Sequence, residues 1–197
     1  MKESKSEWIG EIVEWSDPSL LSIEVYPAQF SSLTSKLLQA EHSSDITLLA
    51  VLNMRKLPLD PGRKTFALNM DEDTIKNHYP QQSLFVKQYL SCSIIGSIAD
   101  NHFHQTISAF GIGVHTRVKH LENQWMQWLV SHESALFLFL SSFSKDDSMI
   151  PLLKEIGKQF LDVNPDPSFK HLIFKQLSMI FKEKYFILKD LIQYLQS

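Results

Sequence analysis

The chain has 197 residues, of which 44% are hydrophobic and 21% charged, and its formal net charge is -3 at pH 7. These values are typical of an ordinary globular protein, which buries a sufficient core without a disulfide or a metal to staple it. The negative charge argues against non-specific nucleic-acid binding, which requires a basic face. The single cysteine, Cys92, excludes an internal disulfide and fits a reducing compartment.

The amino-terminal residues are charged and lack the apolar central region of a signal peptide. Polar residues interrupt the longest apolar runs well before the ~18 residues that a membrane span needs. We therefore expect a soluble, cytoplasmic protein. Residues 1–24 hold two lysines and six acids, which indicates either a solvated face or a surface for a basic partner.

Two helices and a short strand are predicted in the first 40 residues. Residues 4–15 predict a terminal helix, because apolar side chains recur at helical spacing and the segment Ser16-Asp17-Pro18 then stops it. Alternation over residues 21–25 predicts a half-buried strand. Pro27 suits the first turn of a second helix.

A hairpin is predicted next. The apolar run of residues 45–54 predicts the best strand of the chain, and residues 64–70 predict the antiparallel strand that returns from a turn. Residues 83–99 predict a helix whose second half is rich in small side chains. Residues 103–118 predict a bent strand, with glycine marking a bulge or kink.

The stretch from Val118 to Phe143 predicts a central helix. Its apolar residues recur at steps of three and four, which marks one face of a helix. From Ala135 to Leu140 the sequence is apolar all round, so this half should be enclosed by other elements.

The remaining residues predict two more helical segments. A helix should run to Leu161, and Asp166 and Pro167 are placed as the cap and first residue of the last helix, which extends to about Gln196. At 1.5 Å per residue this helix would be roughly 43 Å long, against a diameter of about 40 Å for the whole domain. We therefore expect this helix to span the whole domain, to break around residues 182–184, or to project from the domain at its end.

Together these elements predict an α+β fold. We expect a mostly helical single domain around a central buried helix, with a small antiparallel sheet and a long C-terminal helix. Residues 1–165 would form the α+β domain, and residues 166–197 the C-terminal helix, packed on that domain or projecting from it.

Few residues suggest chemistry. His102, His104, His115 and His120 fall within nineteen residues and invite a metal or small-molecule site. Their spacing matches no metal motif, and partly buried polar histidines explain them equally well. Cys92 lies among small residues, as core cysteines do, and we expect neither a catalytic residue nor a cofactor.

The predicted protein-binding residues are aromatic and apolar side chains near the two ends of the chain. Tryptophan is enriched at interface hot spots, although a terminal helix docked on its own domain would also use it. The C-terminal helix carries two apolar stripes, more than one buried face needs. One stripe is then left for another protein subunit or for self-association with a second copy of this chain, unless two layers of the same domain enclose the helix. The residues chosen are Trp8, Trp15, Phe174, Leu177, Phe181, Tyr185 and Leu188.

In size, acidity and a composition rich in Lys, Ser, Leu and Phe, the chain resembles the small acidic adaptors and chaperones of bacterial specialised secretion, especially type IV coupling complexes. The resemblance implies protein subunits as partners and a cytoplasmic place beside the inner membrane, and it transfers no functional residue. We expect a non-catalytic protein-binding adaptor or chaperone that presents secreted effectors to such a complex. The alternative is a small-molecule or metal-cofactor-binding domain built on the four histidines.

Overall fold

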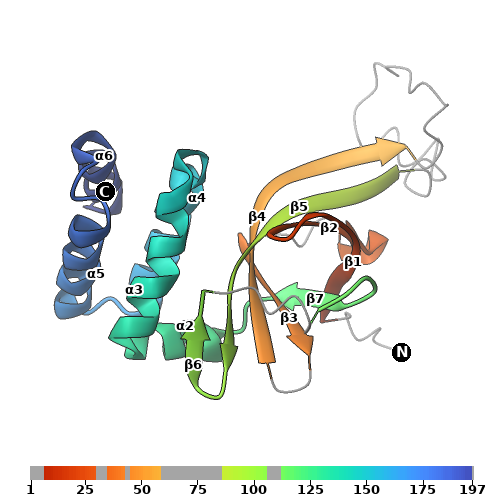
Figure 1. Ribbon diagram of the computed structural model, residues 1–197, viewed down its shortest axis with the longest axis horizontal. Helices are drawn as coiled ribbons and strands as arrows, with labels where there is room; N and C mark the ends of the chain where they lie inside the picture. The colour runs from red at the N-terminus through yellow and green to blue at the C-terminus, as the bar shows by residue number, and fades with distance from the viewer. Residues whose placement is uncertain (1–6, 30–34, 43–44, 59–85, 106–111, 197) are drawn as a thin grey trace.

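A computed structural model describes residues 7–29, 35–42, 45–58, 86–105 and 112–196. Within them, six antiparallel strands close into a barrel in the order β2-β1-β7-β3-β4-β5, and the pairing of β2 with β5 completes the circle. A short seventh strand, β6, pairs with the end of β5 (Figure 1). The strands are β1 (Trp8–Asp17), β2 (Leu20–Val25), β3 (Leu37–His42), β4 (Asp45–Pro58), β5 (Val86–Ala99), β6 (His102–His104) and β7 (Arg117–His120).

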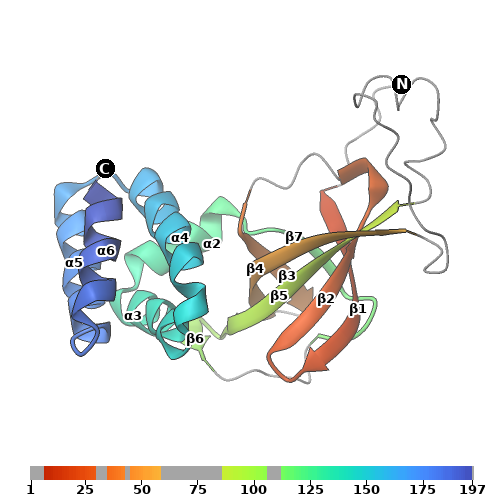
Figure 2. The same ribbon diagram turned by 90° about the horizontal axis from the view of Figure 1, so that it is seen from above.

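Helices make up the second half of the described chain and lie beside the barrel. α2 and α3 are nearest to the strands, and α5 and α6 form the end of the molecule farthest from β1 and β2 (Figures 1 and 2). The helices are α2 (Asn123–Ser131), α3 (Glu133–Ser142), α4 (Ile150–Val163), α5 (Pro167–Ile180) and α6 (Tyr185–Gln196). Short 3-10 turns lie at Pro27–Gln29, Phe143–Lys145 and Asp147–Met149.

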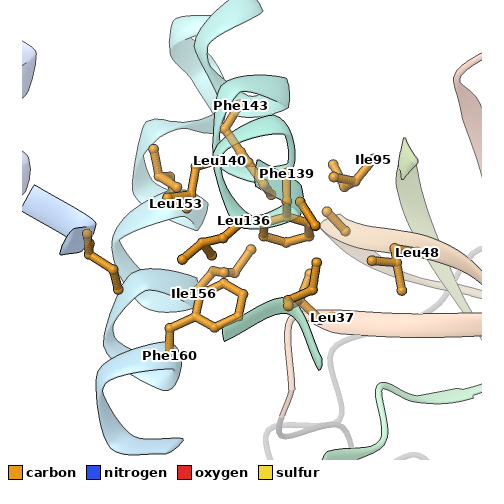
Figure 3. Close-up of a cluster of buried hydrophobic side chains, with 14 of the residues drawn as sticks. Leu37, Leu48, Ile95, Leu136, Phe139, Leu140, Phe143, Leu153, Ile156 and Phe160 are labelled. Atoms are coloured by element: carbon orange, nitrogen blue, oxygen red, sulfur yellow. The ribbon is translucent and has the colours of Figure 1, made fainter. Parts of the chain in front are cut away.

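Two hydrophobic cores hold this arrangement together. The barrel core fills the interior of the strands, and the sheet–helix core lies between the outer wall of the barrel and the helices (Figure 3). β4 contributes to both: Leu49 and Val51 belong to the barrel core, while Ile46, Leu48 and Ala50 belong to the sheet–helix core. A strand covered on both faces is apolar without alternation, which explains the continuous run in this segment.

The predicted fold class is wrong, because a closed six-stranded barrel takes the place of the small sheet. The expected helix over residues 4–15 is strand β1. Its register with β7 shifts between Trp8 and Gly10. Such a bulge inserts a residue and breaks the two-residue alternation, so Ile9 and Ile12, three apart, both lie in the barrel core.

The expected helix over residues 83–99 is also wrong, since this segment forms strand β5. Its small residues serve close strand pairing and not a helix crossing. A Cβ atom on Gly96 would lie 2.5 Å from the carbonyl oxygen of His104 and 2.5 Å from the ring of Phe103. Only glycine admits β6 so close. The second helix, expected from Pro27, is a single 3-10 turn.

The central helix is correct only in part. Residues 117–120 form β7, and the helical portion is divided at His132, whose extended backbone (φ -119, ψ 91) separates α2 from α3. Leu136, Phe139 and Leu140 are buried in the sheet–helix core, as expected of an enclosed segment, while Leu138 is partly exposed.

Other elements are confirmed. β4 is a strand, although its expected hairpin partner at residues 64–70 lies outside the described residues. α4 and the cap of α5 are as predicted, with the Asp166 carboxylate accepting from the Ser168 N–H at 2.9 Å. Of the three alternatives for the last helix, the structure has the break, since α5 ends at Ile180 and α6 begins at Tyr185. The division of the chain at residue 165 stays a prediction about independent folding.

Candidate protein-binding surface

The first two residues of α6 expose their aromatic side chains. Phe186 is 85% exposed and Tyr185 is 66% exposed, and their rings meet edge to face with centroids 5.7 Å apart. We call these two residues the aromatic pair. Met179, on the last turn of α5, adds an apolar side chain that is 47% exposed. Lys182 and Glu183, between the two helices, are exposed as well, so charged groups flank the aromatic pair.

The backbone that carries the aromatic pair is firmly held. Phe181 is fully buried and ends α5 with its N–H donating to the Leu177 carbonyl at 2.9 Å. Lys184 donates from Nζ to the Ser144 carbonyl at 3.2 Å and forms an ion pair with Asp147 at 2.6 Å. These contacts fix the turn against the Phe143–Met149 segment. The two aromatic rings therefore extend from a rigid platform.

α6 itself is fastened to α4. Leu191 and Leu195 are buried in the sheet–helix core, and Leu195 lies against Gly157 of α4. Lys154 of α4 forms an ion pair with Asp190 at 2.6 Å. The inward face of α6 is thus packed against its own domain, whereas no part of the described chain covers the aromatic pair at its first turn.

The structure places the predicted protein-binding residues in three environments. Leu177 and Phe181 are buried in the sheet–helix core, and Phe174 and Leu188 are partly buried against it. Trp8 is partly buried on β1, and Trp15 packs partly buried against the barrel core. Tyr185 alone of the seven is mostly exposed. Phe186, its more exposed neighbour, lies off both apolar stripes. Sequence reasoning missed Phe186 because the candidates were chosen from the stripes, most of whose residues are buried or partly buried against the domain itself.

Trp8 borders a polar cluster at the junction of barrel and helices. The Lys119 side chain is only 9% exposed and lies between the carboxylates of Glu7, Glu41 and Glu122, with Nζ 2.7 Å from Glu41 and 5.3 Å from the Trp8 ring centroid. Desolvation opposes the charge on Lys119, but hydrogen bonds to Glu122 and Glu41 outweigh it and raise the pKa of this lysine. Because Lys119 stays charged, its role is structural: it holds the carboxylates of Glu7, Glu41 and Glu122 together.

A second polar cluster lies on the outer face of β1. The Tyr26 hydroxyl donates to Glu11 Oε1 at 2.5 Å, and His115 and Arg117 approach the same carboxylate at 3.5 and 4.0 Å. The hydrogen bond from Tyr26 is the main cause that lowers the pKa of Glu11, and burial with this carboxylate raises the pKa of Tyr26 to about 12. At neutral pH Glu11 therefore stays ionised and Tyr26 stays protonated. Neither group is tuned to act as a general acid or base.

The four histidines do not converge. His102 and His104 are exposed on β6 with ring centroids 6.4 Å apart, whereas His115 is beside Glu11 of β1 and His120 ends β7. Within the described part of the chain, no group of three histidine, cysteine or acidic side chains could hold a metal ion. Cys92 is buried in the barrel core, and desolvation raises the pKa of its thiol to about 12. It is a poor nucleophile there.

A shallow cleft of about 320 Å³ lies where β3 meets α2 and the end of α4. It is lined by Ser35, Leu37, Leu121, Asn123, Met126, Gln159, Asp162 and Val163. It has one carboxylate and no histidine, so it lacks the convergent titratable groups of a catalytic pocket.

Neither a scan of protein-family models nor a search of curated proteins finds a match for this chain. Among the described residues, no helix combines the length and the apolar character that crossing a membrane would need.

Proposed function

We propose that this protein is a non-catalytic protein-binding adaptor or chaperone, and that the aromatic pair is its principal contact. The observation that carries the proposal is the 85% exposure of Phe186 beside Tyr185 on a turn anchored by Phe181 and Lys184. Large aromatic side chains on rigid supports are the usual anchors of protein interfaces. Burying a side chain of this size contributes about 1.5–3 kcal/mol, a gain that the free protein forgoes.

The proposed partners are other protein subunits. The resemblance to adaptors of type IV secretion coupling complexes supports a partner of that small class and a cytoplasmic place beside the inner membrane. The presentation of secreted effectors remains part of the proposal. A small-molecule or metal function at the histidines receives less support, because His102 and His104 lie on β6 and His115 lies beside Glu11 of β1.

The test is a binding measurement on the double variant Tyr185→Ser/Phe186→Ala, with partners first captured from the native cell extract on the unmodified chain and then purified. We expect the affinity for the captured partner to fall by roughly 30-fold or more, since losing an aromatic hot spot costs about 2 kcal/mol or more. The free energy of unfolding should change by no more than about 0.5 kcal/mol, because both side chains are exposed.

Val114→Ala is the matched control. Val114 is 51% exposed and follows Gly113, shortly before β7, so this variant also removes an exposed apolar side chain but leaves the aromatic pair intact. Its affinity should equal that of the unmodified chain. If the double variant keeps full affinity for every captured partner, the aromatic pair is not the contact and the proposal fails.

A further inference from the structure

Two histidines of β6 lie side by side on one face of the strand. Side chains alternate between the two faces of a strand, so His102 and His104 point to one side and Phe103 points to the other. Both histidines are exposed, whereas Phe103 is buried. The centroids of the two imidazole rings are 6.4 Å apart, and the ring planes are tilted by 48°. The four histidines of the sequence do not form one site, but these two rings are close enough to share one small ligand.

The backbone sets the protonation of one ring. Nδ1 of His102 lies 2.8 Å from the carbonyl oxygen of Asp100. Because a carbonyl oxygen can only accept a hydrogen bond, Nδ1 carries the hydrogen and donates it, and the lone pair of the neutral ring is then on Nε2. Histidines that bind metals have this arrangement: the second ring nitrogen donates to a backbone carbonyl or a carboxylate, which fixes the orientation of the ring.

β6 holds the two histidines on a rigid support. All three residues of β6 pair with β5, and Gly96 of β5 lets the strand approach closely. The Phe103 ring packs edge to face against Phe139 of α3, with centroids 6.0 Å apart. The side-chain amide of Gln105, directly after β6, donates to the Leu138 carbonyl at 2.6 Å. The backbone is therefore held by both the barrel and α3, and side-chain rotation alone can bring two ring nitrogens to one ion.

We propose that His102 and His104 together bind one divalent transition-metal ion of the zinc, copper and nickel class. Imidazole nitrogen is a favoured ligand of these metals, and zinc–nitrogen bonds are about 2.0–2.1 Å long. Once one ring binds the ion, the other ring is beside it at a high effective concentration, so the two rings bind more tightly than either alone. Within the described part of the chain no third histidine, cysteine or acidic group joins them, and water completes the coordination. The site involves neither residue of the aromatic pair and does not depend on the proposed role of that pair.

The test is calorimetric titration of the full chain, purified without a histidine tag or a nickel column and freed of metal with a chelator. ZnCl₂, CuCl₂ and MgCl₂ are added separately at neutral pH. We expect one tightly bound ion per chain for zinc and for copper, with copper bound more tightly, as is usual among divalent metals. Mg²⁺ prefers oxygen ligands and should not bind. Copper should also broaden the amide NMR signals of residues 97–99 and 102–104 first, because these paired strand residues surround the site.

Three variants distinguish a chelate from ordinary surface histidines. His102→Ala and His104→Ala should each weaken zinc binding at least about tenfold, since each removes one of two linked ligands. His171→Ala is the matched control, because it removes a single exposed histidine from α5, and it should bind zinc as the unmodified chain does. All three side chains are exposed, so the melting temperature of the metal-free protein should hardly change in any variant.

Unchanged zinc affinity in either His102→Ala or His104→Ala would exclude the two-histidine chelate. An equal loss of affinity in His171→Ala would make the binding a general property of exposed histidines and would reject the site. Absence of saturable binding of both zinc and copper would overturn the proposal outright, and none of these outcomes bears on the aromatic pair.

Discussion

The two hydrophobic cores differ in what fills them. Among the described residues, the buried members of the barrel core are aliphatic or cysteine, while the sheet–helix core contains six buried phenylalanines. A closed six-stranded barrel has a narrow interior, which small and branched side chains fill. The space between a curved wall and a helix layer is wider and less regular, and aromatic rings bridge it. The strands of the barrel are thus held by the hydrogen bonds that close the circle between β2 and β5. The helices are held to the barrel by the packing of phenylalanine rings.

Phe139 lies at the centre of that ring packing. It is fully buried, and its ring packs against the rings of three other phenylalanines. Its ring centroid lies 6.0 Å from that of Phe103 in β6, 5.4 Å from that of Phe143 and 5.5 Å from that of Phe160 in α4. Three elements therefore meet at one side chain.

The largest effect is expected from Phe139→Ala. It should lower the free energy of unfolding by about 3–5 kcal/mol, as large-to-small core changes do, measured by urea denaturation. Hydrogen exchange should accelerate in the helices more than in β1 and β2, because only the helices rely on these rings. A loss below about 1 kcal/mol, or equal acceleration in both regions, would contradict the division between the cores.

The next effect concerns the junction of β6 with the barrel. Gly96→Ala would place a methyl group 2.5 Å from a backbone oxygen of β6, and overpacking of this kind costs about 1–3 kcal/mol. Gly113→Ala is the matched control, because nothing lies within 4 Å of its Cβ position. Thermal unfolding should show a lowered melting temperature for the first variant alone. Equal melting of the two would mean that β6 yields easily and supports the helices little.

The smallest expected effect is at the polar junction. Lys119→Met should cost about 1 kcal/mol at neutral pH, much less than in a fully buried cluster, because Glu41 and Glu122 remain about a third exposed. Hydrogen bonding to Lys119 lowers the pKa of Glu122. Its stabilising contribution is therefore present above the unfolded pKa of about 4.3 and is lost as the pH falls.

The difference in stability between Lys119→Met and the unmodified chain should accordingly shrink below about pH 4.3, as Glu122 protonates. Urea denaturation at about pH 7 and about pH 3 measures this difference. A difference that stays constant or widens on acidification would show that Lys119 acts through packing and not through charge.

The helical half was largely predictable from local pattern. The period of α4 and the Asp166 cap depend on contacts within one or two turns, which neighbouring residues determine by themselves. The interruption near residues 182–184 was one of three alternatives that the sequence left open. The strand at β4 was predictable for a related reason, since a long apolar run bounded by turn residues marks a strand buried on both faces.

The barrel was not predictable in this way. Ile9 and Ile12 can both face the barrel core at helical spacing because a bulge shifts the register of β1 against β7, and this bulge is defined by a partner strand that lies far away in the sequence. The small residues of β5 are equally ambiguous until Gly96 is seen against β6.

The candidate binding surfaces follow the same rule. Sequence by itself determined that Tyr185 and its apolar neighbours belong to a C-terminal helical segment with more apolar surface than one face needs. Only the tertiary structure decided that Leu177 and Phe181 are core and that Phe186 is exposed. The physical reason is that burial depends on which surfaces of distant elements meet, and local periodicity carries no information about that meeting.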